Sequence, residues 1–250
     1  MSETCIAPRR TTPLEQNAQL ALVCFGHNNY NCYKIKKMEA SSENLPTRGE
    51  FYLLMPDATR SGRGHGVEID NEEALLTPPR LIIRLRGGGF PVLKETPRLR
   101  HYPEVGDPPE DLEGGLSGYW LVSGRLKDVL SRVDPAGFEF LACDYRQADG
   151  SEGPRYYLCE VARELDALDE RNSKLAIEVS DEFVAGKFYD LSGGTSLAFR
   201  KDVVGEAHVF RTPYSGFTFC DRLLRDAVWD AGIGGAKKSS GLRFKDAADL

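Results

Sequence analysis

The 250-residue sequence has no long hydrophobic run. Its longest apolar stretch is the six residues Leu20 to Phe25. A membrane helix needs about 18 to 20 apolar residues, and a secretory signal needs about 7 to 15 followed by a small residue at the cleavage point. Here Val23 precedes Cys24, so the run fits neither pattern. The sequence therefore predicts a cytoplasmic protein that makes no contact with membranes.

Paired cysteines and clustered histidines are also missing. The six cysteines lie far apart with no CxxC pair, which predicts reduced thiols instead of a disulfide framework: Cys5, Cys24, Cys32, Cys143, Cys159 and Cys220. The four histidines are equally scattered, and none belongs to an HExxH motif: His27, His65, His101 and His208. We therefore expect no metal ligands.

An excess of positive charge is absent as well. The net charge is −6, with 28% of residues charged, which argues against the usual basic nucleic-acid binder. Hydrophobic residues at 41% and aromatic residues at 10% exclude a wholly disordered chain. Composition thus predicts an acidic globular protein that binds no nucleic acid.

The first fifty residues differ from the rest. Six basic and five acidic side chains give residues 1–50 a net charge of +1, which leaves −7 on residues 51–250. No helical or strand periodicity runs through this segment, so we predict a flexible N-terminal tail. A short packed helix over residues 14–25 is the alternative. We also consider a true start at Met38, just before the first convincing strand.

Residues 51–250 show short strands in series with few helices. One helix is expected after Ser123, a plausible N-cap, with Leu126, Val129, Leu130 and Val133 on one face and an end at Asp134-Pro135. A late helix should bury Leu223, Leu224, Ala227 and Val228 and end near Gly232. Strands are expected at residues 51–54, 81–85, 119–122, 138–143, 156–161, 174–179, 188–191, 196–200, 207–211 and 241–244. This order predicts one α+β domain, mostly antiparallel, with two or three helices.

Catalytic motifs are not found. The glycines at residues 87–89 and 232–235 lack the lysine and serine spacing of a phosphate-binding loop. Residues 115–119 miss the nucleophile elbow, because Tyr119 stands where the last glycine should be. Cys143 and Cys159 fall on neighbouring strands, where buried thiols are the simpler interpretation. We expect no catalytic residue and no cofactor.

Carboxylates form the one cluster open to a chemical interpretation. Asp166 and Asp169 could share a helical face, which is how acid–base or cation sites begin. A solvated turn with capping aspartates is the simpler alternative. An enzyme that acts on a small molecule or modifies a macromolecule through these two residues therefore stays open as a second hypothesis.

The C-terminal part resembles a known family. The stretches that carry the resemblance are residues 123–130, 161–173, 207–211, 219–221 and 241–244, and the start at residues 51–54 agrees. Together they resemble the eleventh family catalogued among the immunity proteins of bacterial polymorphic toxin systems, formerly a domain of unknown function. The resemblance covers about residues 51–250 and is strongest after residue 119; residues 237–240 look like an insertion.

This resemblance implies a protein that binds a cognate toxin and neutralises it by occlusion in competition between bacteria. Catalytic residues are not expected in such a protein. A chaperone or scaffold for a secreted effector is a further alternative, which would bind without abolishing toxin activity. The charge of −7 on residues 51–250 favours a basic toxin.

Two acidic patches are the predicted partner-binding sites. The first spans residues 104–113, and the second is the turn at residues 166–170. Two tyrosines beside the first patch are the predicted binding hot spots, because aromatic anchors usually outweigh charges at the rim of an interface. A solvated acidic loop is the simpler interpretation of either patch. The candidate residues are Tyr102, Glu104, Asp107, Glu110, Asp111, Glu113, Tyr119, Asp166 and Asp169.

Overall fold

The computed structural model describes residues 44–57, 64–76, 78, 82, 85, 87–235 and 240–250. All of them fall within one compact unit, residues 40–250. Most of the predicted tail lies outside the described residues, as do the alternative helix at residues 14–25, Met38, and most of the predicted strand at residues 81–85.

The last residues of the predicted tail contact the folded unit. Gly49 donates its backbone N–H to the Asp246 carboxylate at 2.7 Å, and Arg48 forms an ion pair with Asp249 at 3.0 Å. Glu50 pairs with Lys201 at 2.6 Å. Residues 44–50 therefore belong structurally with the strands that follow them.

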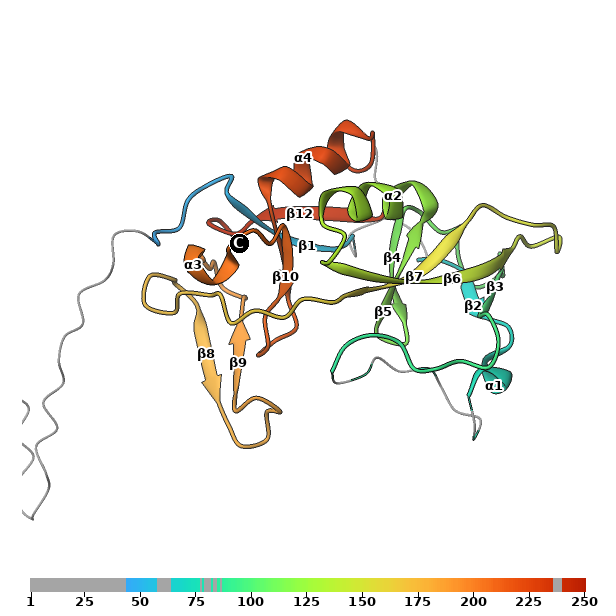
Figure 1. Cartoon of the computed structure of the whole chain (residues 1–250), viewed down its shortest axis with the longest axis horizontal. Helices are drawn as coiled ribbons and strands as arrows, with labels where there is room; N and C mark the ends of the chain where they lie inside the picture. Colours follow the sequence, from blue (N-terminus) through green and yellow to red (C-terminus); the bar gives the residue numbers. More distant parts are fainter. Residues whose placement is uncertain are drawn as a thin grey trace, which may run out of the picture. The chain divides into compact units, whose positions relative to one another are not determined.

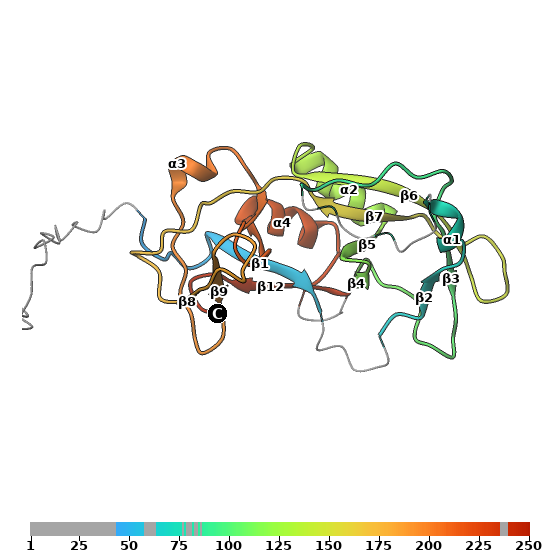
Figure 2. The ribbon, with the colours of Figure 1, turned by 90° about the horizontal axis from the view of Figure 1, so that it is seen from below.

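One sheet joins the beginning of the described chain to its end. Its four antiparallel strands lie in the order β10-β11-β1-β12, with β1 pairing along both edges. Figure 2 shows β1 beside β12. Tyr52 and Leu54 on β1 enter one hydrophobic cluster, whereas Leu53 enters another on the opposite face. This alternation explains why β1 is buried on both faces. The strands are β1 (Phe51–Pro56), β10 (Val209–Arg211), β11 (Thr218–Asp221) and β12 (Leu242–Asp246).

The second sheet is mixed and has six strands in the order β2-β3-β6-β7-β5-β4 (Figure 1). Only the β3–β6 pair is parallel; the other neighbours are antiparallel. The antiparallel β6–β7 hairpin places Cys143 and Cys159 on neighbouring strands, as predicted. The strands are β2 (Val67–Ile69), β3 (Arg98–His101), β4 (Leu112–Leu116), β5 (Tyr119–Ser123), β6 (Phe138–Arg146) and β7 (Tyr156–Val161).

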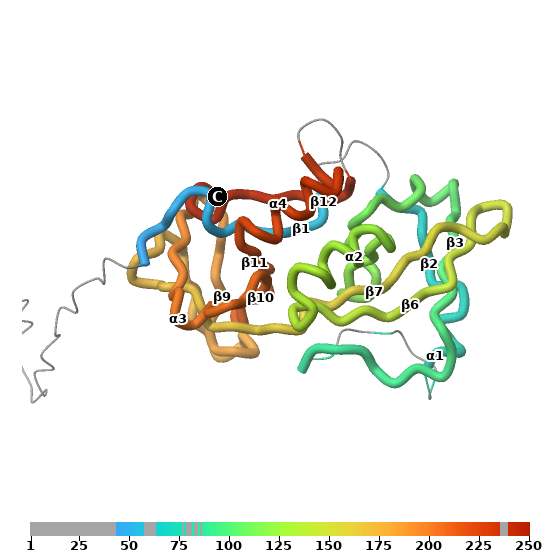
Figure 3. The backbone as a smooth tube through the Cα atoms, turned by 45° about the horizontal axis from the view of Figure 1, so that its top comes forward, coloured from blue at the N-terminus to red at the C-terminus, as the bar shows by residue number. Residues whose placement is uncertain are grey.

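Two helices cover these sheets and contact each other. In Figure 3, α2 (Gly124–Val133) lies along β7 and α4 (Arg222–Asp230) lies near β1. The predicted face of α2 is buried at Leu126, Val129 and Leu130 and half-buried at Val133. One hydrophobic cluster contains residues from both helices and both sheets, so the sheets share a core.

The late helix departs from its prediction at one position. Leu224 and Val228 of α4 are buried, but Leu223 is 53% exposed. Since Asp221 caps the helix by accepting the N–H of Leu224, the helix begins at Arg222 and its buried stripe passes through residues 224 and 228. Leu223 lies one residue off that stripe.

A separate hairpin consists of β8 (Ala176–Val179) and β9 (Lys187–Asp190). The strand predicted at residues 196–200 is wrong: this segment makes only isolated bridges, such as Lys174 to Ser196 and Leu168 to Phe199. Leu197, Ala198 and Phe199 are buried in succession, so the segment passes through the core without alternating. A four-residue helix, α3 (Lys201–Val204), follows, and another, α1 (Glu72–Leu75), precedes β3.

The predicted α+β class with mostly antiparallel strands is confirmed. Across the described ranges, no helix is both long enough and apolar enough to span a membrane.

The cap of α2 gives a first prediction. The Ser123 hydroxyl accepts the N–H of Leu126 at 3.3 Å and donates to Asp111 at 2.5 Å. Ser123→Ala should lower the free energy of unfolding by about 1 kcal/mol, as measured by urea denaturation. Ser131→Ala, the same substitution inside α2, is the control and should change it by less than about 0.5 kcal/mol. Equal losses from both variants would contradict the capping role.

Candidate functional site

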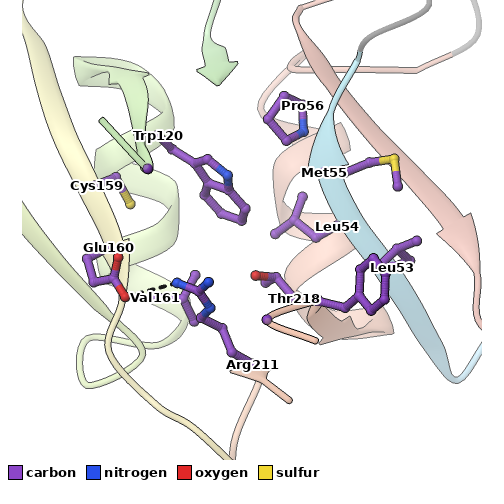
Figure 4. Close-up of a pocket in the computed structure, with 13 residues that line it drawn as sticks. Leu53, Leu54, Met55, Pro56, Trp120, Cys159, Glu160, Val161, Arg211 and Thr218 are labelled. Carbon is purple, nitrogen blue, oxygen red and sulfur yellow. Dashed lines mark hydrogen bonds and ion pairs between the residues drawn. The ribbon is translucent and has the colours of Figure 1, made fainter. Parts of the chain in front are cut away.

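A pocket of about 230 Å³ lies between the two sheets (Figure 4). One wall is β1 with the start of β11, and the other is formed by β5 and β7, so the pocket exists only because the sheets meet here. Its lining residues are Leu53, Leu54, Met55, Pro56, Gly118, Trp120, Cys159, Glu160, Val161, Arg211, Gly216, Phe217 and Thr218.

A buried ion pair forms the polar side of this pocket. Arg211 on β10 donates to the carboxylate of Glu160 on β7 at 3.0 Å. The Glu160 side chain is only 1% exposed, and that of Arg211 is 18% exposed. Gly216, with φ of 67°, lies beside this guanidinium, where a Cβ atom would come within 3.1 Å of Nη2. The pair therefore links the two sheets at the floor of the pocket.

The rest of the pocket is mostly apolar. Trp120 from β5 faces Leu54 and Thr218 across the cavity in Figure 4. Met55, Trp120 and Phe217 are only half-buried. A space of this kind can accept an apolar side chain or small apolar group, while the Glu160–Arg211 pair supplies a fixed polar edge.

Cys159 lines the pocket, and two further thiols lie elsewhere in the fold, Cys220 buried on β11 and Cys143 half-buried on β6. Burial raises the pKa of Cys143 to about 12 and holds the pKa values of Cys159 and Cys220 well above the usual range. The thiolate is the reactive form of cysteine, so these side chains are poor nucleophiles. Within the described residues, no cluster of three His, Cys, Asp or Glu side chains could hold a metal ion.

The thiols give a second prediction. At about pH 8, iodoacetamide should leave Cys143, Cys159 and Cys220 almost unmodified in the folded protein, because nearly all of each thiol stays protonated and covered. Peptide mass spectrometry would measure alkylation at each position, and the same protein in urea is the control that should react fully. Rapid labelling of Cys159 without denaturant would contradict this account of the pocket wall.

The first predicted acidic patch is divided between surface and interior. Glu104 is exposed, and Asp107 and Glu110 are half-buried, but Asp111 and Glu113 are buried. Asp111 accepts hydrogen bonds from Ser123 and from Arg125 Nε, the latter at 2.6 Å, and Glu113 accepts the N–H of Glu110 at 2.8 Å. In this conformation, a partner cannot reach Asp111 and Glu113.

The two predicted tyrosine anchors also differ in exposure. Tyr102 is half-buried, with its hydroxyl 3.2 Å from Asp70 and its ring beneath Arg100. Tyr119 is 1% exposed and stacks on Phe90, with ring centroids 4.7 Å apart. A side chain so enclosed contributes to the core, and it is not part of a surface that a partner could contact.

The second patch is irregular: Leu168 makes an isolated bridge to Phe199, and a turn begins only at Glu170. Asp166 is exposed, with its carboxylate 3.4 Å from Arg200 and 3.2 Å from the hydroxyl of Tyr214. Asp169 instead accepts the backbone N–H groups of Arg171 and Asn172. Burial alone would raise the pKa of Asp169, but hydrogen bonds from the side chains of Asn172 and Asn44 and from these backbone groups outweigh it and lower the pKa. No helix joins the two carboxylates, and each has its own partners.

Glu160 and Arg211 are residues that the sequence analysis did not select. The available signal was a single carboxylate within the otherwise apolar strand Tyr156–Val161. A charge at such a position predicts a buried partner, but the sequence gives no means of choosing Arg211, 51 residues further on.

A comparison with known protein families identifies the family of the chain. A family model described as "Immunity protein family (Imm11)" matches residues 50–249. The chain belongs to this immunity protein family. The Imm11 match includes all the strands, both sheets and the pocket, and it confirms the resemblance seen in the sequence. No curated protein matches the chain.

Proposed function

We propose that this protein is the immunity partner of a bacterial toxin and that it neutralises the toxin by occluding it, without catalysis. The observation that carries the proposal is the Imm11 match over residues 50–249. In competition between bacteria, an immunity protein must meet the toxin inside the cell that it protects. We therefore propose that this protein acts in the cytoplasm.

The chemistry of the described residues supports a binding role. The pocket carboxylate is held by a guanidinium, and the nearby thiols are protonated. The alternative enzyme would need Asp166 and Asp169 to act together. Asp166 instead faces Arg200, whereas Asp169 caps its own turn. These contacts favour structural roles for both carboxylates.

The charge of the domain favours a basic toxin. Residues 51–250 carry a net charge of −7, and long-range attraction would raise the association rate at low salt. Among the predicted contacts, Glu104 and Asp166 are the exposed carboxylates and are the ones we retain. Glu104→Lys should then slow association more than it speeds dissociation.

Stoichiometry tests this function. The cognate toxin domain is first sought among the proteins encoded beside the gene, and its own activity is then assayed while the purified protein is added. Occlusion predicts that activity is lost at one molecule per toxin. It also predicts that the double variant Asp166→Asn, Asp169→Asn still neutralises at that stoichiometry, with association slowed by the loss of the Asp166 charge. Substoichiometric protection that disappears in the double variant would favour the enzyme. Binding that leaves the toxin active would favour the chaperone or scaffold.

A further inference from the structure

The strand β8 exposes all four of its residues, Ala176 to Val179. Ile177 and Val179 lie on one face, and Val179 is 80% exposed. Val184, in the turn that joins β8 to β9, is 87% exposed. Figure 1 shows this hairpin projecting from the part of the fold that also holds α3 and β10. Val179 and Val184 are therefore largely in solvent, and Ile177 is 37% exposed, all within eight residues of sequence.

The open edge of β8 can be read from the pairing register. Ser180, just after β8, donates its N–H to the carbonyl of Gly186. In an antiparallel pair every second residue bonds to the partner strand, so Glu178 and Ala176 bond to β9 in the same way. The backbone groups of the residues between them point away from β9. Ile177 lies opposite Tyr189, and Val179 lies opposite Lys187. Tyr189 follows the same rule, since its N–H points away from β8 and donates to Ser215 at 3.0 Å. Ile177 and Val179 thus direct their backbone N–H and C=O groups away from β9, where no other described strand pairs with them.

Contacts of β9 hold the hairpin, together with the bridge from Lys174, just before β8, to Ser196. The buried Tyr189 donates its hydroxyl to Glu170 at 2.7 Å, and Lys187 forms an ion pair with the same carboxylate. The Lys187 ammonium lies 3.8 Å from the ring centroid of Tyr214. An isolated two-stranded hairpin is marginal in water, so these contacts fix β9 and hold β8 in a preformed extended conformation.

An open, flat, apolar edge is normally blocked by proline, lysine or a bulge, because it otherwise invites pairing with another chain. The Ala-Ile-Glu-Val sequence of β8 has no proline, lysine or bulge, and its pairing with β9 is regular. Its protection is limited to its length of four residues and the Glu178 carboxylate. A strand with these properties is suited to main-chain recognition by strand addition.

We propose that β8 is the docking edge for a β-strand of the toxin, and that this strand carries apolar and basic side chains. The inference rests on the proposed function, because that function supplies a protein partner. The net negative charge of the hairpin favours a basic partner strand. Residues 174–190 contain two lysines, of which Lys187 is already paired with Glu170, and four carboxylates: Glu178, Asp181, Glu182 and Asp190. A second copy of β8 would bring like charges together, whereas a basic strand complements them.

Three substitutions in the full chain test the edge. Val179→Lys opposes a basic strand, and Val179→Pro removes the outward N–H without removing a bond to β9. Val92→Lys is the matched control, because Val92 is 95% exposed, lies outside the hairpin, and gives the same change in charge. Surface plasmon resonance with the toxin-domain protein should show Kd raised about tenfold or more by either Val179 variant, and less than about twofold by Val92→Lys.

Hydrogen exchange gives an independent readout. Toxin binding should slow exchange at the amides of Ile177 and Val179, which face outward, and should change little at Glu178, which already bonds to β9. If the wild type neutralises the toxin and both Val179 variants bind it equally well, the docking edge is refuted while the proposed function stands. A dimer of the free protein that Val179→Lys dissociates would refute the toxin strand in favour of a second copy. A wild type that does not bind the toxin at all would refute the proposed function itself.

Discussion

Asp134→Ala is expected to lower the free energy of unfolding by about 3 to 5 kcal/mol. The Asp134 carboxylate, at the end of α2, accepts from Arg163 at 2.5 and 3.1 Å. It also accepts the backbone N–H groups of His208 and Val209 at 3.0 and 3.2 Å. Removing it leaves a guanidinium and two backbone donors without their acceptor, in a place that water reaches poorly. One side chain thus joins α2, the segment after β7, and β10.

Asp144→Ala is the matched control for this prediction. Asp144 also pairs with an arginine, Arg146, at 3.2 Å, but their side chains are 37% and 43% exposed, against 6% for Asp134. Surface pairs of this kind contribute about 0 to 1 kcal/mol, so its loss should be small. Guanidinium denaturation of both variants measures the difference. Similar losses from the two substitutions would contradict the bridging role of Asp134.

The same carboxylate should make stability depend on pH. Burial alone would raise the pKa of Asp134, but the hydrogen bonds from Arg163 and the backbone outweigh it and lower the pKa. A group whose pKa is lower in the folded state stabilises the fold above its unfolded pKa of about 4 and loses this contribution as the pH falls through the folded value. The gap in stability between the wild type and Asp134→Ala should therefore narrow in acid.

Local signals in the sequence predicted the parts of the fold that depend on neighbouring residues. The cap at Ser123, the apolar period through Leu130 and the stop at Asp134 all lie within a dozen residues, and α2 matches them. The pairing of β1 with β12 joins segments nearly two hundred residues apart, and no periodicity within either strand specifies such a partner. Residues 196–200 were misassigned for a related reason. These residues are apolar because the segment passes through the core. A short apolar run of this kind has the same sequence pattern as a buried strand.

The site was harder to predict than the fold, because composition does not reveal burial. The acidic residues at 104–113 were predicted to form one surface patch, yet the cap of α2 draws Asp111 inward. Glu160 was the opposite case, a charge hidden in an apolar strand whose partner comes from another sheet. Both outcomes depend on contacts between distant segments. The resemblance to the family required no such contacts, since it depends on the order of short motifs along the chain.

Tyr119→Ala should also lower the free energy of unfolding by about 3 to 5 kcal/mol. The ring is enclosed and stacks on Phe90, and its hydroxyl donates to the carbonyl of Gly89 at 2.9 Å. Truncation removes the stack and leaves a cavity beneath residues 87–90. Tyr119→Phe keeps the ring and loses only the hydrogen bond, so its cost should be about 1 kcal/mol. Thermal and urea denaturation would rank the two variants.

The Tyr119→Phe variant also separates a core residue from a binding hot spot. Truncating a hot-spot side chain weakens binding by about 2 kcal/mol or more and changes the free energy of unfolding little. Truncating a core side chain lowers the free energy of unfolding and leaves the binding surface intact. We expect Tyr119→Phe to be measurably less stable and to bind the toxin-domain protein with an unchanged Kd. A variant of full stability with weakened binding would instead place Tyr119 at the interface, which would require the loop around Phe90 to open when the partner binds.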